Sequence, residues 1–468
     1  MRKNQFGVFK IMTFMVVMIL YFLMIYGMMW ELQLFYRLPP EIRFKAMLVI
    51  CILYCVVFFC CLQFTEGMSI GKRRILDLIF GFFASSLCVN AASAVLCEIF
   101  VDSHRRVILG FGVMLIFLQC VIGMIWIIVC HRQYEKVQFC KEAIFIYGSR
   151  EDAREYVRVN NTINQYFKIS RSVSYTMGLE QILEEIRESS VVFLGDIPVD
   201  IRNVILKFCM AGKIECCSIP KISDIYIQNA KVLQLNDKLL LQYPPLSIDG
   251  EHGAVKRCMD VVLSLLMLIC TSPLMLVITV LIKLEDGGPV IYVQDRVTLN
   301  GRSFRMYKFR SMYVDAEKEG ARMARKNDDR ITRVGRVIRN LHFDELPQLV
   351  NVLRGEMSMV GPRPERQEFI DVYSRYIPEF PERLKVKAGL TGYAQVYGRY
   401  NSEPEDKIKY DLYYIYNYSF WLDLKLLVLT VRILFQKENT EGVNADQISA
   451  LRHSREHEKR EQDQDILP

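Results

Sequence analysis

The sequence lacks the cysteine and histidine patterns that mark a zinc site, a disulfide framework or a thiol catalyst. It has no CxxC pair and no catalytic arrangement of histidine with cysteine. Nine of its 14 cysteines lie in apolar runs, where a thiol behaves as a small hydrophobic group: Cys51, Cys55, Cys60, Cys61, Cys88, Cys97, Cys120, Cys130 and Cys270. This usage favours reducing, cytosolic surroundings for the polar parts of the chain.

Concentrated positive charge is also absent. The net charge is only +7 over 468 residues. A nucleic-acid-binding protein gathers its basic residues on one face, whereas here they flank apolar segments, as in membrane proteins. Hydrophobic residues make up 51% of the chain and the mean hydropathy is +0.15, although 24% of the residues are charged. We therefore expect apolar segments joined to polar domains, a lipid bilayer as partner, and no nucleic acid.

Four apolar stretches occupy the first third of the chain, near residues 11–30, 46–64, 77–100 and 107–130. Each approaches the roughly 20 residues that a helix needs to cross a bilayer. The first could be a signal peptide, but it lacks a small-residue cleavage site and three further stretches follow it. The flanking cations favour a cytosolic N-terminus. Residues 1–140 are thus predicted to form a four-helix transmembrane region, and the polar residues of the third stretch are expected at contacts between helices.

Residues 141–250 have the pattern of a small α/β domain. Buried strands are predicted at 143–149, 191–196 and 214–218, the first two ending in glycine and polar residues before a helical pattern. This is a Rossmann-like rhythm, but Gly148 and Gly195 are single glycines without a GxGxxG loop. Both a nucleotide-binding domain and a structural or docking domain remain open.

A fifth apolar segment, 258–283, differs from the first four. Ser272-Pro273 interrupts it, and a proline inside a helix removes a hydrogen bond and bends the helix. Cations flank both of its ends, Lys256-Arg257 and Lys283. We therefore predict a re-entrant helix that dips into one leaflet and returns, with a kinked fifth span as the alternative.

The polar remainder is predicted to continue to residue 437, with strands at 291–297 and 303–312. The aromatic-rich stretch 405–435 is predicted to be an amphipathic helix on the membrane surface, with buried core as the alternative. The charged stretch 438–468 is predicted to be disordered.

Asp344 and Glu345 stand immediately before Leu346-Pro347, where Pro347 can begin a helix that continues through Leu353. A helix N-terminus suits a phosphate and lowers the pKa of a carboxylate placed there, which would be ionised and usable as a nucleophile or magnesium ligand. The simpler alternative is that both acids only complement the helix dipole.

The surrounding cations favour chemistry at this acid pair. Candidates for binding phosphate or nucleotide are Lys308, Arg310, Arg336, Arg339 and Arg363, with Arg330 and Arg333 nearby. A pyrophosphate substrate needs several such groups and a divalent ion held by one or two carboxylates. Two adjacent acids beside many guanidinium groups indicate phosphoryl transfer with Mg²⁺. His342 is a candidate proton carrier or a local packing contact.

From Lys256 to about Ile433 the chain resembles the bacterial sugar transferases, the monotopic phosphoglycosyl transferases. The matching stretches are Lys256-Arg257 with Asp260, Ser272-Pro273, GGPVIYVQDRV, KFRSM, DDRITRVGRVIR, DELPQL, GEMSMVGPRPE, GLTGYAQVYGR and SFWLDLK. The whole layout is similar to the long form of this family. The resemblance implies an N-terminal helical membrane bundle, a Rossmann-like domain (141–250) and an α/β catalytic domain (251–437) with a re-entrant helix.

The resemblance also implies roles. Asp344 would be the nucleophile that forms a covalent sugar-phosphate intermediate with release of UMP, and Glu345 would assist the attack of the lipid phosphate. Both acids would hold Mg²⁺, while Arg339 and Arg363 match phosphate- or nucleotide-binding positions. The substrates would be a UDP-sugar, with a hexose expected, and polyprenyl (undecaprenyl) phosphate. The catalytic domain would lie on the cytosolic face of the bacterial inner membrane, initiating a surface polysaccharide such as capsule or exopolysaccharide.

Three positions depart from the family pattern: Ala388 replaces a usual proline, Thr298 a common glycine, and His342-Phe343 a small and an aliphatic residue. None removes a charged catalytic group, so substrate preference is the property they could alter.

Two other functions stay open, a glycosyltransferase that releases UDP and a non-catalytic scaffold of glycan export. The long N-terminal region is a candidate for homodimer contacts.

Overall fold

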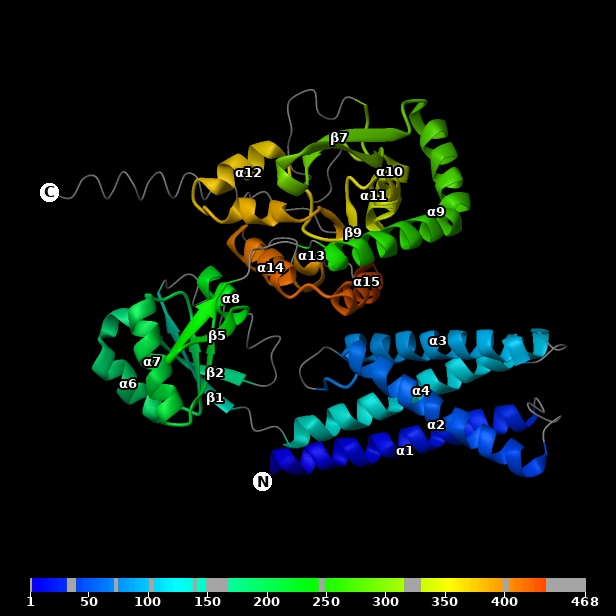
Figure 1. The fold of residues 1–468 in the computed structure, drawn as a ribbon, viewed down its shortest axis with the longest axis horizontal. Coiled ribbons are helices and arrows are strands. Elements are labelled where there is room, and N and C mark those ends of the chain that lie inside the picture. The colour runs from blue at the N-terminus through cyan, green and yellow to red at the C-terminus, as the bar shows by residue number, and fades with distance from the viewer. Residues whose placement is uncertain are drawn as a thin grey trace. The chain divides into compact units, whose positions relative to one another are not determined.

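The computed structural model describes residues 2–31, 39–70, 75–100, 105–137, 141–148, 167–243, 248, 250–314, 330–398 and 404–434. The tail predicted to be disordered, 438–468, lies outside these residues. The chain divides into two units, Met1–Ile219 and Pro220–Pro468 (Figure 1).

Four long apolar helices begin the first unit, as the hydropathy predicted: α1 (Arg2–Glu31), α2 (Pro40–Phe64), α3 (Ile75–Phe100) and α4 (Arg105–Val137) (Figure 1). Each contains a segment long and apolar enough to cross a bilayer. Tyr21, Phe58 and Phe82 pack in the core between them. Large apolar side chains point outward, with Leu53 58% and Phe117 67% exposed, as lipid-facing positions require. These features are those of a membrane helical bundle.

Polar residues of the third stretch lie inside this bundle, as predicted. Ser85, Ser86 and Asn90 are buried, and Asn90 Nδ2 donates to Gln119 Oε1 of α4 at 2.7 Å. Gln119 Nε2 in turn donates to the Tyr54 hydroxyl of α2 at 2.9 Å. Neutral hydrogen-bonding side chains thus connect three helices.

The α/β domain contains a four-stranded parallel sheet in the order β2-β1-β3-β4. Its elements are β1 (Lys141–Tyr147), β2 (Phe167–Ser174), η1 (Tyr175–Met177), α6 (Leu179–Arg187), β3 (Val191–Leu194), α7 (Val199–Ala211) and β4 (Glu215–Ser218). Alternate residues of β1 enter two cores, Ile144 and Ile146 on one face of the sheet and Phe145 on the other. The three predicted strands are present, and β2 was missed because it is a polar edge strand with little apolar signal.

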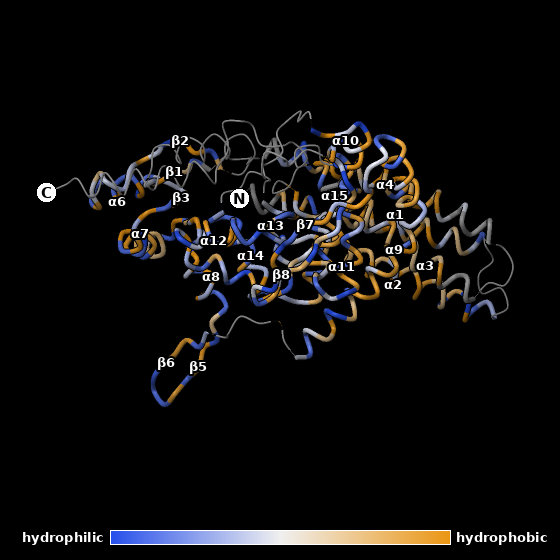
Figure 2. Tube along the Cα trace, turned by 90° about the horizontal axis from the view of Figure 1, so that it is seen from above, coloured by the Kyte–Doolittle hydropathy of each residue, from blue (hydrophilic) through white to orange (hydrophobic). Residues whose placement is uncertain are grey.

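The second unit opens with α8 (Ile222–Gln228) and the hairpin β5 (Lys231–Leu235) and β6 (Lys238–Gln242). Figure 2 shows apolar residues along both strands of this hairpin. A ribbon of β7 (Ile291–Val297) and β8 (Ser303–Phe309) and a parallel pair of β9 (Ser358–Val360) and β10 (Gly389–Thr391) follow. The helices that pack around them are α10 (Arg333–Asn340), α11 (Gln348–Arg354), α12 (Gln367–Ser374), α13 (Tyr393–Tyr397), α14 (Pro404–Tyr416) and α15 (Phe420–Leu434), with 3₁₀ turns η2 (Leu299–Gly301), η3 (Phe343–Glu345) and η4 (Phe380–Lys385).

The fifth apolar segment is α9 (Gly250–Asp286), 37 residues long with Pro273 inside it. Figure 1 shows it as two arms that meet at an angle. Pro273 cannot donate to the carbonyl of Ile269, and the Ser272 hydroxyl donates to that carbonyl instead at 2.8 Å. The serine therefore satisfies the group that the proline leaves without its helical partner.

The aromatic-rich stretch forms two helices with different environments. In α14, Ile408, Leu412 and Tyr414 are buried, so the buried-core alternative describes this helix. In α15, Trp421 is 66% exposed while Asp423 is fully buried. The prediction of one surface helix was therefore wrong for α14, because its apolar positions pack on α8, α13 and η4.

Candidate active site

The acid pair lies in the 3₁₀ turn η3, immediately before α11. His342 precedes it with φ of 55°, a left-handed conformation that reverses the chain after α10. Pro347 is the N-cap residue and α11 begins at Gln348, one residue later than the sequence predicted. Leu346 and Leu349 pack into the core and anchor the turn. The acid pair Asp344-Glu345, called the dyad from here on, is therefore carried by a turn fixed at both ends.

Glu345 is held between two cations from separate elements. Its Oε1 accepts a hydrogen bond from Lys308 Nζ of β8 at 2.8 Å and another from Arg363 Nη2 at 2.9 Å. Burial by itself raises the pKa of Glu345, but Lys308 and Arg363 outweigh burial, and the pKa lies well below its usual value. Glu345 is thus a firmly ionised carboxylate.

Asp344 differs from its neighbour, and the expected low pKa was wrong. Burial raises the pKa of Asp344, and the charge of Glu345 raises it further, against the opposing effects of Lys308, Arg339 and His342. No side chain caps α11, and its N-cap residue, Pro347, has no N–H to donate. Two adjacent carboxylates with separated pKa values are a common feature of acid–base and nucleophilic sites.

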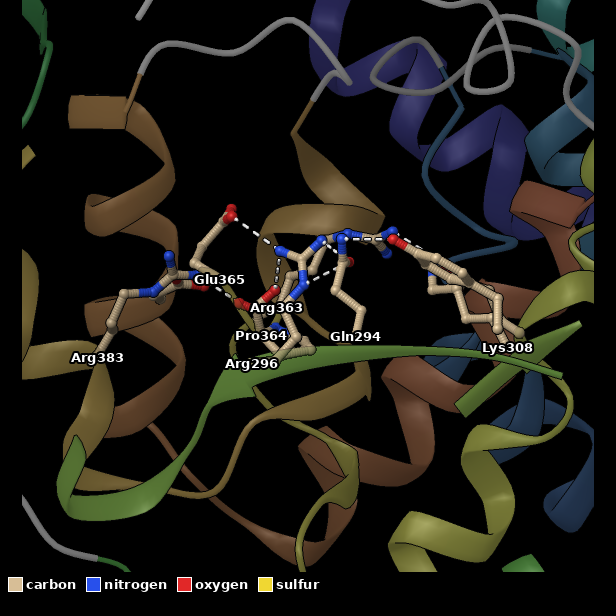
Figure 3. Close-up of polar contacts among 10 residues, drawn as sticks. Gln294, Arg296, Lys308, Arg363, Pro364, Glu365 and Arg383 are labelled. Carbon is tan, nitrogen blue, oxygen red and sulfur yellow. Dashed lines mark hydrogen bonds and ion pairs between the residues drawn. The ribbon is translucent and has the colours of Figure 1, made fainter. Parts of the chain in front are cut away.

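The loop that carries Arg363 is fixed by two further arginines (Figure 3). Arg383 Nη2 donates to the Arg363 carbonyl at 2.9 Å, and Arg296 Nη1 donates to the Pro364 carbonyl at 3.2 Å. Arg296 also donates to Gln294 Oε1 and lies 3.5 Å from Glu365 Oε2. Backbone carbonyls on both sides of the Arg363–Pro364 bond are therefore tied down, which directs the Arg363 side chain toward Glu345.

Arg383 itself depends on a buried partner. Its Nη2 lies 2.8 Å from Asp411 Oδ2 of α14, and both side chains are almost fully buried. Burial raises the pKa of Asp411 to about 6, although Arg383 acts in the opposite direction. The sequence motifs did not single out Gln294, Arg296, Glu365, Arg383 or Asp411 as individual site residues. The QDRV motif was the available signal for the first two.

The other predicted cations lie in different places. Arg339, in the last turn of α10, is partly buried and favours the ionised form of Asp344. Arg336 is exposed on the same helix, with no contact to the dyad among the described residues. Arg310 is buried against Gly288 and forms an ion pair with Asp286 at the end of α9. Arg310 thus braces the membrane helix in this structure, whereas Lys308 and Arg363 meet the dyad.

Within the described residues, no three His, Cys, Asp or Glu side chains form a cluster that could hold a metal. The dyad can still offer one or two carboxylates, a donor set that suits Mg²⁺ when substrate phosphates complete its coordination. One oxygen of Glu345 is already occupied by Lys308 and Arg363. The residues present therefore fit a substrate-bridged Mg²⁺ and do not form a closed protein cage.

Comparison with known proteins places this site in a family. The model of the family described as bacterial sugar transferase matches residues 251–437, which include the dyad and all the cations above. A glucose-1-phosphate transferase relative in Caulobacter vibrioides is 43% identical over 189 residues, covering 71% of that protein and 39% of this chain. The chain belongs to the bacterial sugar transferase family.

Longer members of the family match over part of their length. A UDP-N-acetylgalactosamine-undecaprenyl-phosphate N-acetylgalactosaminephosphotransferase from Aeromonas hydrophila is 42% identical over 229 residues, 48% of this chain and 53% of the relative. A UDP-glucose:undecaprenyl-phosphate glucose-1-phosphate transferase from Xanthomonas campestris pv. campestris is 40% identical over 299 residues, 62% of this chain and 57% of the relative. The chain spans about half the length of these curated relatives. Their names include two different sugars.

Proposed function

We propose that this bacterial sugar transferase moves a sugar 1-phosphate from a UDP-sugar to undecaprenyl phosphate and thereby initiates a surface polysaccharide. The observation that carries the proposal is the dyad itself: a half-buried Asp344 beside an ionised Glu345, with cations directed at them from β8, α10 and the Arg363 loop. Such an arrangement stabilises phosphate charge at a nucleophile. The names of the relatives support the substrate pair. A hexose 1-phosphate is the expected group, with an N-acetylated sugar as the alternative.

In the proposed first step, an Asp344 carboxylate oxygen attacks the phosphorus that carries the sugar. The Asp344–phosphorus bond forms as the pyrophosphate bond breaks, and UMP leaves with the bridging oxygen. In the second step an oxygen of the lipid phosphate attacks the same phosphorus and frees Asp344. Asp344 must be ionised to attack, and Lys308, Arg339 and His342 all favour the ionised form. A covalent intermediate divides one difficult transfer into two displacements.

Glu345 has a different role in this proposal. Because its pKa is strongly lowered, it is a poor proton acceptor. Its contact with both Lys308 and Arg363 fits an organising role, in which it holds two cations where the incoming lipid phosphate needs them. We infer that Glu345 assists the second step in this way.

Mg²⁺ is proposed to be held by Asp344 and Glu345 together with the pyrophosphate oxygens. It would offset phosphate charge when bound. Lys308, Arg339 and Arg363 are assigned to phosphate or nucleotide binding on their proximity to the dyad. Arg310 and Arg336 stay in the proposal as further candidates for phosphate binding. Arg310 keeps two buried guanidinium nitrogens, Nε and Nη1, without a hydrogen-bond partner among the described residues.

For the membrane topology we propose that α9 is re-entrant and that the dyad faces the cytosol. The first arm of α9 contacts β9 and α15 through Lys256 and Asp260. The second arm packs Ile278 and Ile282 against Phe309 and Ile338 of the same polar unit. A helix that crossed the bilayer would carry its two ends to opposite sides, so shared contacts at both ends favour re-entry. UDP-sugars are cytosolic, which is consistent with this orientation.

The parallel sheet of the α/β domain is proposed to be a Rossmann-like docking domain. Gly148 stands close to the backbone of Asp196, so it is explained by packing between strand ends.

A homodimer formed through the N-terminal region is a further part of the proposal. Light scattering of the purified protein would measure its mass, and a monomer at all concentrations would contradict this part.

The decisive test combines purified protein, Mg²⁺, polyprenyl phosphate and a panel of UDP-sugars, with mass spectrometry of the lipid product and identification of the released nucleotide. The expected result is a lipid diphosphate sugar together with UMP. Release of UDP would identify a glycosyltransferase that moves only the sugar. Asp344→Asn should abolish product formation, and unchanged product formation in this variant would overturn the proposed nucleophile.

A further inference from the structure

We propose that Arg257 and Asp260, at the base of the membrane helix α9, are positioning residues that set the geometry between the dyad and Arg363. This inference rests on the function proposed above. In the sequence, Lys256-Arg257 flanks an apolar segment and, with Asp260, is one of the stretches that carry the family resemblance. Their contacts assign them a more specific task.

Arg257 caps the helix that follows the dyad. Its Nη1 donates to the Val352 carbonyl and its Nη2 to the Leu353 carbonyl, both at 2.7 Å. These are carbonyls of the last turn of α11. The Val352 carbonyl also accepts from the Gly355 N–H at 3.0 Å, and the bidentate guanidinium adds a bond to each carbonyl while complementing the helix dipole. Because α11 has only seven residues, its length is about 10 Å, and a displacement of one end is transmitted to the other.

The end of α11 is shaped to receive this guanidinium. Gly355 ends the helix with φ of 81°, which favours glycine. A Cβ at this position would lie 3.4 Å from Arg257 Cζ, at van der Waals contact. The glycine thus allows the left-handed turn against which the guanidinium packs.

Asp260 fixes the strand that leads to Arg363. Its Oδ1 accepts from Ser358 Oγ at 3.0 Å and from the Met359 N–H at 2.9 Å, and the carboxylate is almost fully buried. Three residues apart on a helix, Arg257 and Asp260 lie on one face. One turn of α9 therefore holds both the C-terminal end of α11 and strand β9. Arg363 follows Met359 of that strand by four residues.

The second arm of α9 acts on the opposite side of the site. The Glu285 carboxylate accepts from the Arg333 N–H at 2.7 Å and from the Val334 N–H at 3.2 Å, which caps the N-terminus of α10. Arg339 lies at the other end of α10. Both arms of the membrane segment are therefore connected, through short helices, to groups that act on the dyad. The contacts at the base of α9 are the firmer of the two sets, because the Asp260 carboxylate is buried and Arg257 and Asp260 lie on one turn.

A double-mutant cycle tests the inference. We would measure kcat/KM for UMP release by the full-length protein with Mg²⁺, polyprenyl phosphate and whichever UDP-sugar the wild type accepts. R257Q should lower it about 10- to 100-fold, because a displacement of the dyad by a fraction of an ångström is costly. R257K, which keeps the charge but loses the fork, should recover part of that loss. If Arg257 acts through the relative placement of the dyad and Arg363, then R363Q should cost much less in the R257Q background than in the wild type.

The control cycle pairs R363Q with R302Q, since Arg302 is exposed on the ribbon and far in sequence from these anchors. There the two losses should simply multiply. The same multiplication for R257Q with R363Q, or an unaltered rate in R257Q, would overturn the inference. D260N, combined with R363Q in the same way, provides a second cycle if R257Q fails to fold. A wild-type protein without turnover would instead contradict the proposed function, so the two failures are distinguishable.

Discussion

The N-terminal bundle and the catalytic unit both bury polar side chains, but of different kinds. The bundle buries neutral groups, Tyr54, Asn90 and Gln119, which satisfy one another. The catalytic unit buries charges in pairs, Lys256 with Asp423 and Arg383 with Asp411. Charged groups are expensive within a bilayer, whereas a water-exposed domain can hold them when every partner is in place. The difference shows what the buried polar groups do in each region: in the bundle they hold helices together, and in the catalytic unit they position charged side chains.

The largest effect on stability is expected from breaking one buried charge pair. Lys256 Nζ lies 2.6 Å from Asp423 Oδ2 and also donates to the Val360 carbonyl at 2.9 Å. Lys256→Met leaves Asp423 charged and unpaired in the core, which should cost about 3–5 kcal/mol of unfolding free energy. The double variant Lys256→Met/Asp423→Leu should cost much less, because both charges are gone. Thermal unfolding in detergent would compare the two, and equal losses would show that the pair is not the source of the cost.

The second prediction concerns pH. The pKa of Asp411 is raised to about 6 in the folded state against about 4 in the unfolded chain, so the folded protein retains this proton longer. Its contribution to stability is fully present below pH 4 and is lost as the pH rises toward 6, on the order of 3 kcal/mol. Asp411→Asn replaces the carboxyl with an amide, which does not titrate in this pH range. Wild type should therefore lose stability relative to Asp411→Asn between pH 4 and 6, and parallel pH profiles would contradict the assignment.

A smaller effect is expected from two positions that depart from the family pattern together. The Thr298 hydroxyl accepts from the buried Ala388 N–H at 3.1 Å and donates to the Glu356 carbonyl at 2.9 Å. A proline at position 388 would have no N–H to satisfy. Thr298→Val should cost about 1–3 kcal/mol, since it leaves buried groups unpaired.

In an Ala388→Pro background the same Thr298→Val change should cost less, because one of the two unpaired groups no longer exists. Chemical unfolding of the four proteins would measure the coupling. Strict additivity would mean that the two departures are independent. A positive coupling would show that Thr298 compensates for the N–H that Ala388 introduces.

The same comparison explains what the sequence could predict. Long apolar runs made the four bundle helices visible, and the strands β7 and β8 followed from local pattern. The dyad and its contacts with Lys308 and Arg363 were anticipated as a group, because acids and guanidinium groups are chemically conspicuous. The opposite pKa directions of Asp344 and Glu345 were not, since they depend on burial and on which cation faces which oxygen. The ion pair of Arg310 with Asp286 was not anticipated for the same reason: the residue type suits phosphate, and this pairing is a property of the fold alone.

The smallest effect is expected in the bundle. Asn90 Nδ2 donates to Gln119 Oε1 and also to the Ser86 carbonyl at 2.7 Å. Asn90→Leu removes these bonds but introduces no charge, and hydrogen bonds between membrane helices contribute only about 0.6 kcal/mol on average. We expect a fall in unfolding temperature of a few degrees at most and unchanged product formation. Ser93→Ala, a partly buried position on the same helix, is the matched control. If Asn90→Leu destabilised the protein as much as Lys256→Met does, the distinction between the two regions would fall. Polar contacts inside the bilayer would then contribute as strongly as the buried charge pairs.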